Sequence, residues 1–134
     1  MNLTDDTPPE YRLEPKPVIT EIILPNIITP SLNELNKLHW RKRDSLRAKY
    51  ERYIWAARPN QHSGRVRIEV YRHSSGTLDD DNFRGGCKQL IDALKQQKVI
   101  VDDTDVYLRE KFYQQVRIMR GGPKMMVIKI TDLI

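Results

Sequence analysis

Residues 65–94 read RVRIEVYRHSSGTLDDDNFRGGCKQLIDAL, so a strand pattern, an acidic cluster and a helix pattern follow one another directly. Val66, Ile68 and Val70 alternate with polar residues, which predicts a strand over residues 65–71 with one buried face. The next residues, 72–78, are rich in turn formers and predict a loop that leads to the acidic cluster.

The second half of this stretch predicts a helix from about Phe83 to Gln97. Its apolar residues recur at the spacing of one helix face, and they are Phe83, Cys87, Leu90, Ile91 and Leu94. Gly85 and Gly86 weaken the first turn, because each glycine costs about 1 kcal/mol relative to alanine in a helix. They allow a helix start as late as Gly86 or Cys87, and Cys87 itself is expected in the core.

Upstream, residues 17–24 predict a strand that Pro25 ends. Ser31 and Glu34 have the spacing of a helix N-cap and its acidic partner, and a helix is expected from there to about Ala57. Its second half is the more regular, whereas residues 39–41 are expected either as a loop or as helix that leaves the core.

Downstream, residues 99–101 form a short apolar run that we expect to be buried. Residues 112–119 and 125–131 both alternate, and the glycines and proline between them predict a hairpin. The fold class is therefore α+β, with a small mixed or antiparallel sheet covered by two helices.

The chain of 134 residues has the size of one domain. Residues 1–16 are polar and proline-rich, which predicts a flexible arm before a domain over residues 17–134, and they lack the apolar core of a signal peptide. One cysteine excludes an intrachain disulfide framework, and no apolar run is long enough to span a bilayer. We therefore expect a cytoplasmic protein.

The positive charge is concentrated in one segment. The net charge of the chain is +5, and residues 37–58 alone carry eight basic and two acidic residues. Such a segment indicates a polyanion partner, although a solvated helix face is the alternative. The candidate residues of this segment for contact with a polyanion such as DNA are Lys37, Trp40, Arg41, Lys42, Arg43 and Arg47. Trp40 could stack on an unpaired base or pack in the core.

The carboxylates lie in two groups, Asp79-Asp80-Asp81 before the helix of residues 83–97 and Asp102-Asp103 after it. If the chain returns antiparallel to that helix, Asp103 comes back beside Asp79 and Asp81. Three carboxylates at one place would suit Mg²⁺, with Mn²⁺ as the alternative ion, and such an ion beside a basic surface suits phosphodiester hydrolysis. The alternatives are a helix N-cap with acidic first-turn residues and an ordinary turn.

The ordered motifs resemble the RusA family of Holliday junction resolvases and its phage and prophage relatives. The matching elements are Pro30-Ser31-Leu32-Asn33, Asp79-Asp80-Asp81-Asn82, Lys88, Asp92-Ala93-Leu94 and Asp102-Asp103. The resemblance covers residues 17–131. It implies an α+β homodimer in the bacterial host cell that nicks four-way DNA junctions with Mg²⁺ in the course of recombination and repair.

Carried over by motif, the resemblance implies that Asp79, Asp81 and Asp103 are metal-binding catalytic acids, with Asp102 in support. The lysine that assists at the phosphate corresponds to Lys88 when counted back from Asp92. The chain has about three more residues here than the bacterial enzymes, so a loop at Gly85-Gly86 would restore Lys88. Arg84 is the other cation that could take this role.

Three functions remain open at this stage: a Mg²⁺-dependent endonuclease for branched DNA, a DNA-binding module that has lost cleavage, and a small dimer whose aspartates bind metal structurally. The acid set favours the first over the second, because a pure binder gains nothing from acids that repel phosphate. The third leaves the basic segment unexplained.

Overall fold

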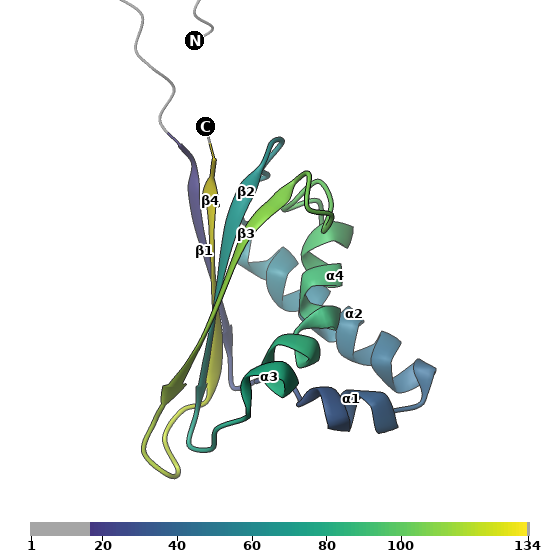
Figure 1. The fold of residues 1–134 in the computed structure, drawn as a ribbon, viewed down its shortest axis with the longest axis vertical. Coiled ribbons are helices and arrows are strands. Elements are labelled where there is room, and N and C mark those ends of the chain that lie inside the picture. The colour runs from purple at the N-terminus through teal and green to yellow at the C-terminus, as the bar shows by residue number, and fades with distance from the viewer. Residues whose placement is uncertain (1–16, 134) are drawn as a thin grey trace, which may run out of the picture.

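The computed structural model describes residues 17–133 and shows an α+β fold, in which a four-stranded mixed sheet carries helices on one face (Figure 1). The elements are β1 (Ile19–Pro25), α1 (Leu32–Lys37), α2 (Trp40–Ala57), β2 (Val66–Ser74), α3 (Asp80–Gly86), α4 (Lys88–Gln96), β3 (Leu108–Arg117) and β4 (Met125–Asp132). The α+β class is confirmed. The structure has four helices over the described residues where two were predicted, because each predicted helix is divided in two. The expected flexible arm lies outside the described residues.

The strand order is β1-β4-β2-β3, with β4 antiparallel to both β1 and β2, and β3 parallel to β2. Central pairs such as Ile68 with Ile130 and Val70 with Ile128 place the predicted alternating residues on the helix-covered face. The predicted hairpin between the last two strands is wrong, since β2 lies between them. Alternation reveals that a segment is a strand but does not reveal its neighbour.

Among residues 17–133, no helix or loop covers the second face of the sheet, which we call the uncovered sheet face (Figure 1). In β1, Ile22 and Leu24 are fully buried under the helices, whereas Ile19 and Ile23 on the other face are 54% and 50% exposed. Phe112 of β3 adds a third exposed apolar side chain to this uncovered face. The apolar run of β1 therefore does alternate in burial, although its sequence does not.

The chain between β1 and β2 forms α1 and α2, separated at Leu38 and His39. The predicted cap is confirmed, because the Ser31 hydroxyl accepts from the Glu34 N–H at 3.0 Å and the Glu34 carboxylate accepts from the Ser31 N–H. His39 caps α2, its Nδ1 accepting from the Arg41 N–H at 3.2 Å. Residues 40 and 41 are thus the first turn of α2, not loop.

The chain between β2 and β3 forms α3 and α4, which divide at Cys87. Helix α3 begins at Asp80, earlier than predicted, and contains both glycines. A Cβ on Gly86 would overlap the Pro30 carbonyl oxygen, and one on Gly85 would press on Leu32 at 2.7 Å. Glycine at both positions therefore allows the segment that starts α1 to pack directly against α3.

The core lies between the sheet and the helices. The predicted helix faces are confirmed by the burial of Tyr50 and Ile54 from α2 and of Leu90 and Leu94 from α4. Cys87 is buried as predicted, and burial raises the pKa of its thiol to about 12. The apolar run at residues 99–101 is buried at its first two positions only.

Candidate active site and nucleic-acid interface

The first acidic group occupies the start of α3. Asp79 is the N-cap residue, with Asp80 and Asp81 in the first turn, and all three are exposed. The Asp79 carboxylate makes no bond to the helix backbone and instead accepts from the Asn82 side-chain amide. Asp79 therefore occupies the N-cap position, as the N-cap alternative predicts, but its carboxylate does not make the hydrogen bond to the helix backbone that is typical of this position.

A side chain of β3 fixes the chain just before these carboxylates. The Gln115 amide accepts from the Leu78 N–H at 2.7 Å and donates to the Leu78 carbonyl at 2.6 Å. Both backbone groups of Leu78 are thus held by one side chain on the neighbouring strand. No local pattern predicts this role for Gln115, because the role depends on β3 lying beside β2.

Asn82 joins the two segments that carry the family resemblance. Its side-chain oxygen accepts from the Asn33 N–H at 3.3 Å, while its amide donates to Asp79. Segments that are 49 residues apart in the sequence therefore meet at one side chain. The close contact of Gly85 and Gly86 with residues 30–32 lies beside this link.

The cation next to these carboxylates is Arg84. Its Nε lies 2.9 Å from Asp80 Oδ2, and its guanidinium group lies 5.0 Å from the centre of the Tyr113 ring. Lys88 is the exposed first residue of α4, one turn later and beyond the break at Cys87. The expected loop at Gly85-Gly86 is wrong, since both residues are helical. Which cation takes the lysine role stays a prediction.

The second acidic group lies beside the end of α4. Lys95 Nζ lies 3.2 Å from Asp102 and 3.7 Å from Asp103. The Asp103 N–H donates to the Asp102 carboxylate at 2.8 Å, and this bond, together with Lys95, lowers the pKa of Asp102. The pKa of Lys95 is raised by the same partnership with Asp102.

The structure does not bring the two acidic groups together. The first group follows Leu78, which is held at Gln115 near the end of β3. The second group precedes Leu108, the first residue of β3. These two points of β3 are seven residues apart, which is about 23 Å along a strand. No three His, Cys, Asp or Glu side chains of residues 17–133 are grouped to hold a metal ion. The expected antiparallel return to the start of α3 is not found, because β3 pairs parallel to β2 and must begin at its far end.

The fit to a divalent ion is accordingly incomplete within one chain. Asp79 and Asp81, at the same helix start, are the two carboxylates that remain available, whereas Asp102 and Asp103 are paired with Lys95. The predicted set of three carboxylates around one ion does not fit this arrangement.

Helix α2 carries most of the predicted nucleic-acid residues. Lys37 at the end of α1 and Arg41 and Lys42 in α2 are exposed, whereas Arg43 and Arg47 are partly buried. Trp40 is 55% exposed, so the alternative of core packing is wrong, and the Arg41 guanidinium group lies 5.2 Å from the centre of its ring. The first turns of α2 therefore present an indole and several cations to solvent.

A second indole, missed in the sequence, lies near the other end of α2. Trp55 is 69% exposed, and Arg52 and Arg58 beside it are exposed too. The sequence contained a signal for this exposure: Trp55 follows Leu46 by nine residues, which is 180° around a helix from the apolar face. An aromatic residue on the polar side of an amphipathic helix points to solvent.

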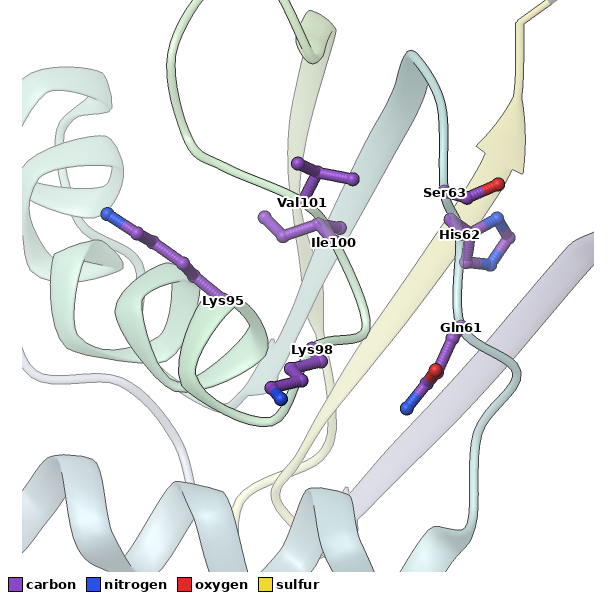
Figure 2. Close-up of a pocket in the computed structure, with 7 residues that line it drawn as sticks. All are labelled: Gln61, His62, Ser63, Lys95, Lys98, Ile100 and Val101. Atoms are coloured by element: carbon purple, nitrogen blue, oxygen red, sulfur yellow. The ribbon is translucent and has the colours of Figure 1, made fainter.

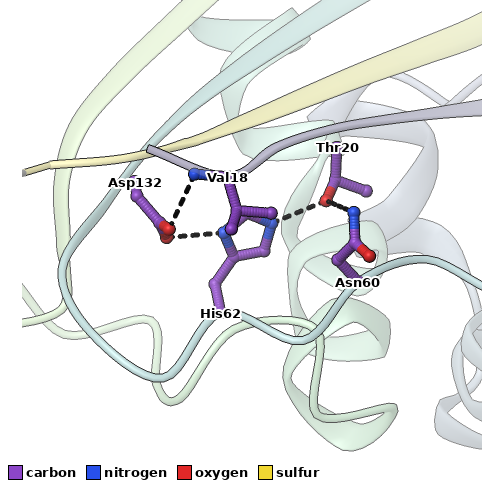
Figure 3. A network of polar contacts seen from close by, with 5 residues as sticks. All are labelled: Val18, Thr20, Asn60, His62 and Asp132. Carbon is purple, nitrogen blue, oxygen red and sulfur yellow. Dashed lines mark hydrogen bonds and ion pairs between the residues drawn. The ribbon is translucent and has the colours of Figure 1, made fainter. Parts of the chain in front are cut away.

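A polar network surrounds His62, a buried residue of the loop before β2 that no sequence pattern singles out (Figure 3). His62 Nδ1 lies 2.7 Å from Asp132 and Nε2 lies 2.7 Å from the Thr20 hydroxyl, to which Asn60 donates at 3.3 Å. A carboxylate can only accept, so Nδ1 carries a proton. Thr20 is 4% exposed, so this network ties the loop before β2 to β1 and β4 rather than forming a reactive site.

No protein-family model matches the chain, and no curated protein matches it either. Over residues 17–133, none of the helices combines the length and the apolar character needed to cross a lipid bilayer.

Proposed function

We propose that this protein is a RusA-like endodeoxyribonuclease that binds branched DNA and hydrolyses its phosphodiester backbone at the start of α3. The observation that carries the proposal is the Asn33–Asn82 contact at 3.3 Å. It joins the two segments of the resemblance in space, around the Asp79 carboxylate that no backbone bond occupies.

The residues have separate tasks in this proposal. The cations of α2 neutralise phosphates and give a salt-dependent affinity. Arg84, next to the carboxylates, faces the phosphate that is cut. Gln115 and Asn82 position the acids by holding Leu78 and Asp79. A bound Mg²⁺ would polarise the phosphate and activate water, with Asp79 and Asp81 as its ligands from α3.

Cutting two strands symmetrically needs two active sites, so we also propose a homodimer. The uncovered sheet face is the contact between its two copies. Ile19, Ile23 and Phe112 expose apolar surface there. Lys129 lies in register between Glu21 and Glu69 on the same face, so a second copy, turned about a two-fold axis, can place carboxylates opposite the lysine. This arrangement leaves α2 free for DNA. We propose the bacterial cytoplasm, in a phage or prophage context, as the setting of this activity.

A second candidate is a DNA-binding module that does not cut. The separation of Asp103 from Asp79 and Asp81 favours it, because hydrolysis by a three-carboxylate site needs these groups at one place. Both candidates share the basic surface of α2, so binding alone does not distinguish them.

The test is a cleavage assay on a synthetic four-way junction and a matching linear duplex, with Mg²⁺ or EDTA. The proteins are wild type, Asp81→Asn and the control Asp105→Asn, which removes an exposed carboxylate outside the motif. Metal-dependent paired nicks at the junction, lost only in Asp81→Asn, are expected for the nuclease. A retarded but uncut junction with wild type would favour the binding module, and the absence of both would overturn both candidates.

A further inference from the structure

The exposed indole of Trp55 stands between two hollows of the surface. One has a volume of about 190 Å³ and is lined by Arg58 and Gln61, and the other has about 310 Å³ and is lined by Arg52, while Trp55 and Gln97 line both. We call these two hollows together the Trp55 groove. Because the indole is a wall of each hollow, a flat ring could enter either hollow and lie against it.

The Trp55 groove continues into a third hollow. Gln61 lines both the groove and a pocket of about 360 Å³ that also includes Lys95 and Lys98 (Figure 2). The side chains of Lys98 and Gln61 lie on opposite walls of this pocket (Figure 2). The path from the end of α2 to the end of α4 is therefore concave and carries the cations Arg52, Arg58 and Lys98. Lys95 is paired with Asp102 and Asp103, and Glu51 is the acid among the described lining residues.

We propose that the Trp55 groove binds unpaired nucleotides of a DNA strand, with a base stacked on the Trp55 indole and the neighbouring phosphates held by Arg52 and Arg58. An aromatic ring between cations has the two components of single-strand binding, because bases stack on aromatic rings and arginines neutralise phosphates. An apolar partner would not need the guanidinium groups on both sides of the ring.

The distance between the two indoles gives the length of the strand. Trp40 and Trp55 are 15 residues apart in α2, which is about 22 Å along the helix axis. A DNA strand that rises about 3.4 Å per nucleotide covers this distance in six to seven nucleotides. The proposal rests on the DNA-binding part of the proposed function and specifies its substrate: branched DNA with an unpaired stretch of about this length, such as a flap or a gap.

Tryptophan fluorescence tests the stacking directly, since the chain has two tryptophans. Trp40→Phe leaves Trp55 as the sole emitter, and titration with a thymidine 15-mer is expected to quench its emission in a saturable way that added NaCl reverses. The reciprocal variant Trp55→Phe reports on Trp40. Unchanged Trp55 emission, under conditions in which the oligonucleotide binds the same variant, would overturn the proposal.

Affinity measurements test the substrate class. Trp55→Ala is expected to weaken binding to a junction with a seven-nucleotide gap by about tenfold, within the range for loss of one base stack, and to leave binding to a fully paired junction within about twofold. Met119→Ala, which removes another exposed apolar side chain far from α2 in the sequence, is the control. An equal loss on both junctions would overturn the proposal.

The outcomes separate this inference from the proposed function. If wild-type protein binds and cuts a fully paired junction, but Trp55 emission in Trp40→Phe does not change on binding the oligonucleotide, the proposed Trp55 groove alone is refuted. Wild-type protein that binds neither junction nor oligonucleotide refutes the DNA-binding function and, with it, the groove.

Discussion

Gly86 of α3 packs against the backbone of Pro30 so closely that a Cβ atom at position 86 would overlap the Pro30 carbonyl oxygen. The contact brings the segment that caps α1 onto the helix that carries the carboxylates. It explains why a glycine pair stands inside a helix, where glycine is unfavourable by itself.

Gly86→Ala is therefore expected to destabilise the protein by about 1–3 kcal/mol, since the backbone of Pro30 must move to admit the methyl group. Helix propensity alone predicts the opposite sign, because alanine is about 1 kcal/mol better than glycine in a helix. Urea unfolding followed by circular dichroism measures the change. Gly76→Ala, where nothing lies within 4 Å, is the control, and stabilisation by Gly86→Ala would contradict the packing.

Arg84→Ala is expected to reduce the cleavage rate by about a hundredfold or more, with a smaller effect on binding, because the guanidinium group lies beside the carboxylates. Lys88→Ala, beyond the break at Cys87, is expected to have the smaller effect on the rate. Single-turnover cleavage of the junction measures both. The reverse order would assign the role at the phosphate to Lys88.

Arg41→Gln and Lys42→Gln are each expected to weaken DNA binding and to lower the slope of log K against log salt by about 0.9, the value for one lost phosphate contact. Both residues are exposed in the first turn of α2. Fluorescence anisotropy at several NaCl concentrations gives the slopes. Lys111→Gln on edge strand β3 is the control, and an equal decrease there would show that net charge, not α2, determines binding.

Asp132→Asn is expected to lower the free energy of unfolding by about 1–2 kcal/mol near neutral pH, because the carboxylate accepts from both His62 Nδ1 and the Val18 N–H, whereas an amide has one acceptor oxygen and no charge. The hydrogen bond from His62 lowers the pKa of Asp132 in the folded protein. The stabilisation that the ionised Asp132 carboxylate adds to the folded protein is therefore complete above the pKa of about 3.9 in the unfolded chain. It is lost as the pH falls through the lower pKa of the folded protein. In urea titrations, the difference in the free energy of unfolding between wild type and Asp132→Asn should become smaller below pH 4. A difference that becomes larger there would contradict the prediction.

Ile23→Lys is expected to convert the proposed dimer into a monomer, because it places a charge on the uncovered sheet face without disturbing the core beneath. Light scattering coupled to size exclusion gives the mass. Met119→Lys is the matched control, as Met119 is exposed outside the strands. A dimer that persists in Ile23→Lys would move the contact to another surface.

The parts of the fold that could be predicted are those that local chemistry controls. The strand at residues 65–71, the Ser31–Glu34 capping box and the buried faces of α2 and α4 follow from alternation, cap spacing and helical periodicity. The helix division at Cys87 did not follow, because the apolar spacing continues across it without interruption.

The candidate site shows the same division. The sequence placed Asp79 and Asp81 at the start of a helix and the cations on α2, because each group is defined by its near neighbours in the chain. The position of Gln115 beside Leu78, and the separation of Asp103 from the start of α3, depend on the strand order. A hairpin between β3 and β4 and the observed parallel pairing of β2 with β3 fit the same alternating pattern equally well.

The sequence by itself determined which main segments are strands and which are helical, which of their faces are apolar and where the charge is concentrated. Tertiary structure alone decided that Asn33 meets Asn82, that Arg84 lies against the Tyr113 ring, and that Asp103 lies at the other end of the parallel pair. The physical reason is the sequence separation of the interacting residues. Helical periodicity and hydrogen bonds between residues a few positions apart depend on the local sequence, whereas the pairing of distant strands depends on the burial of the whole core.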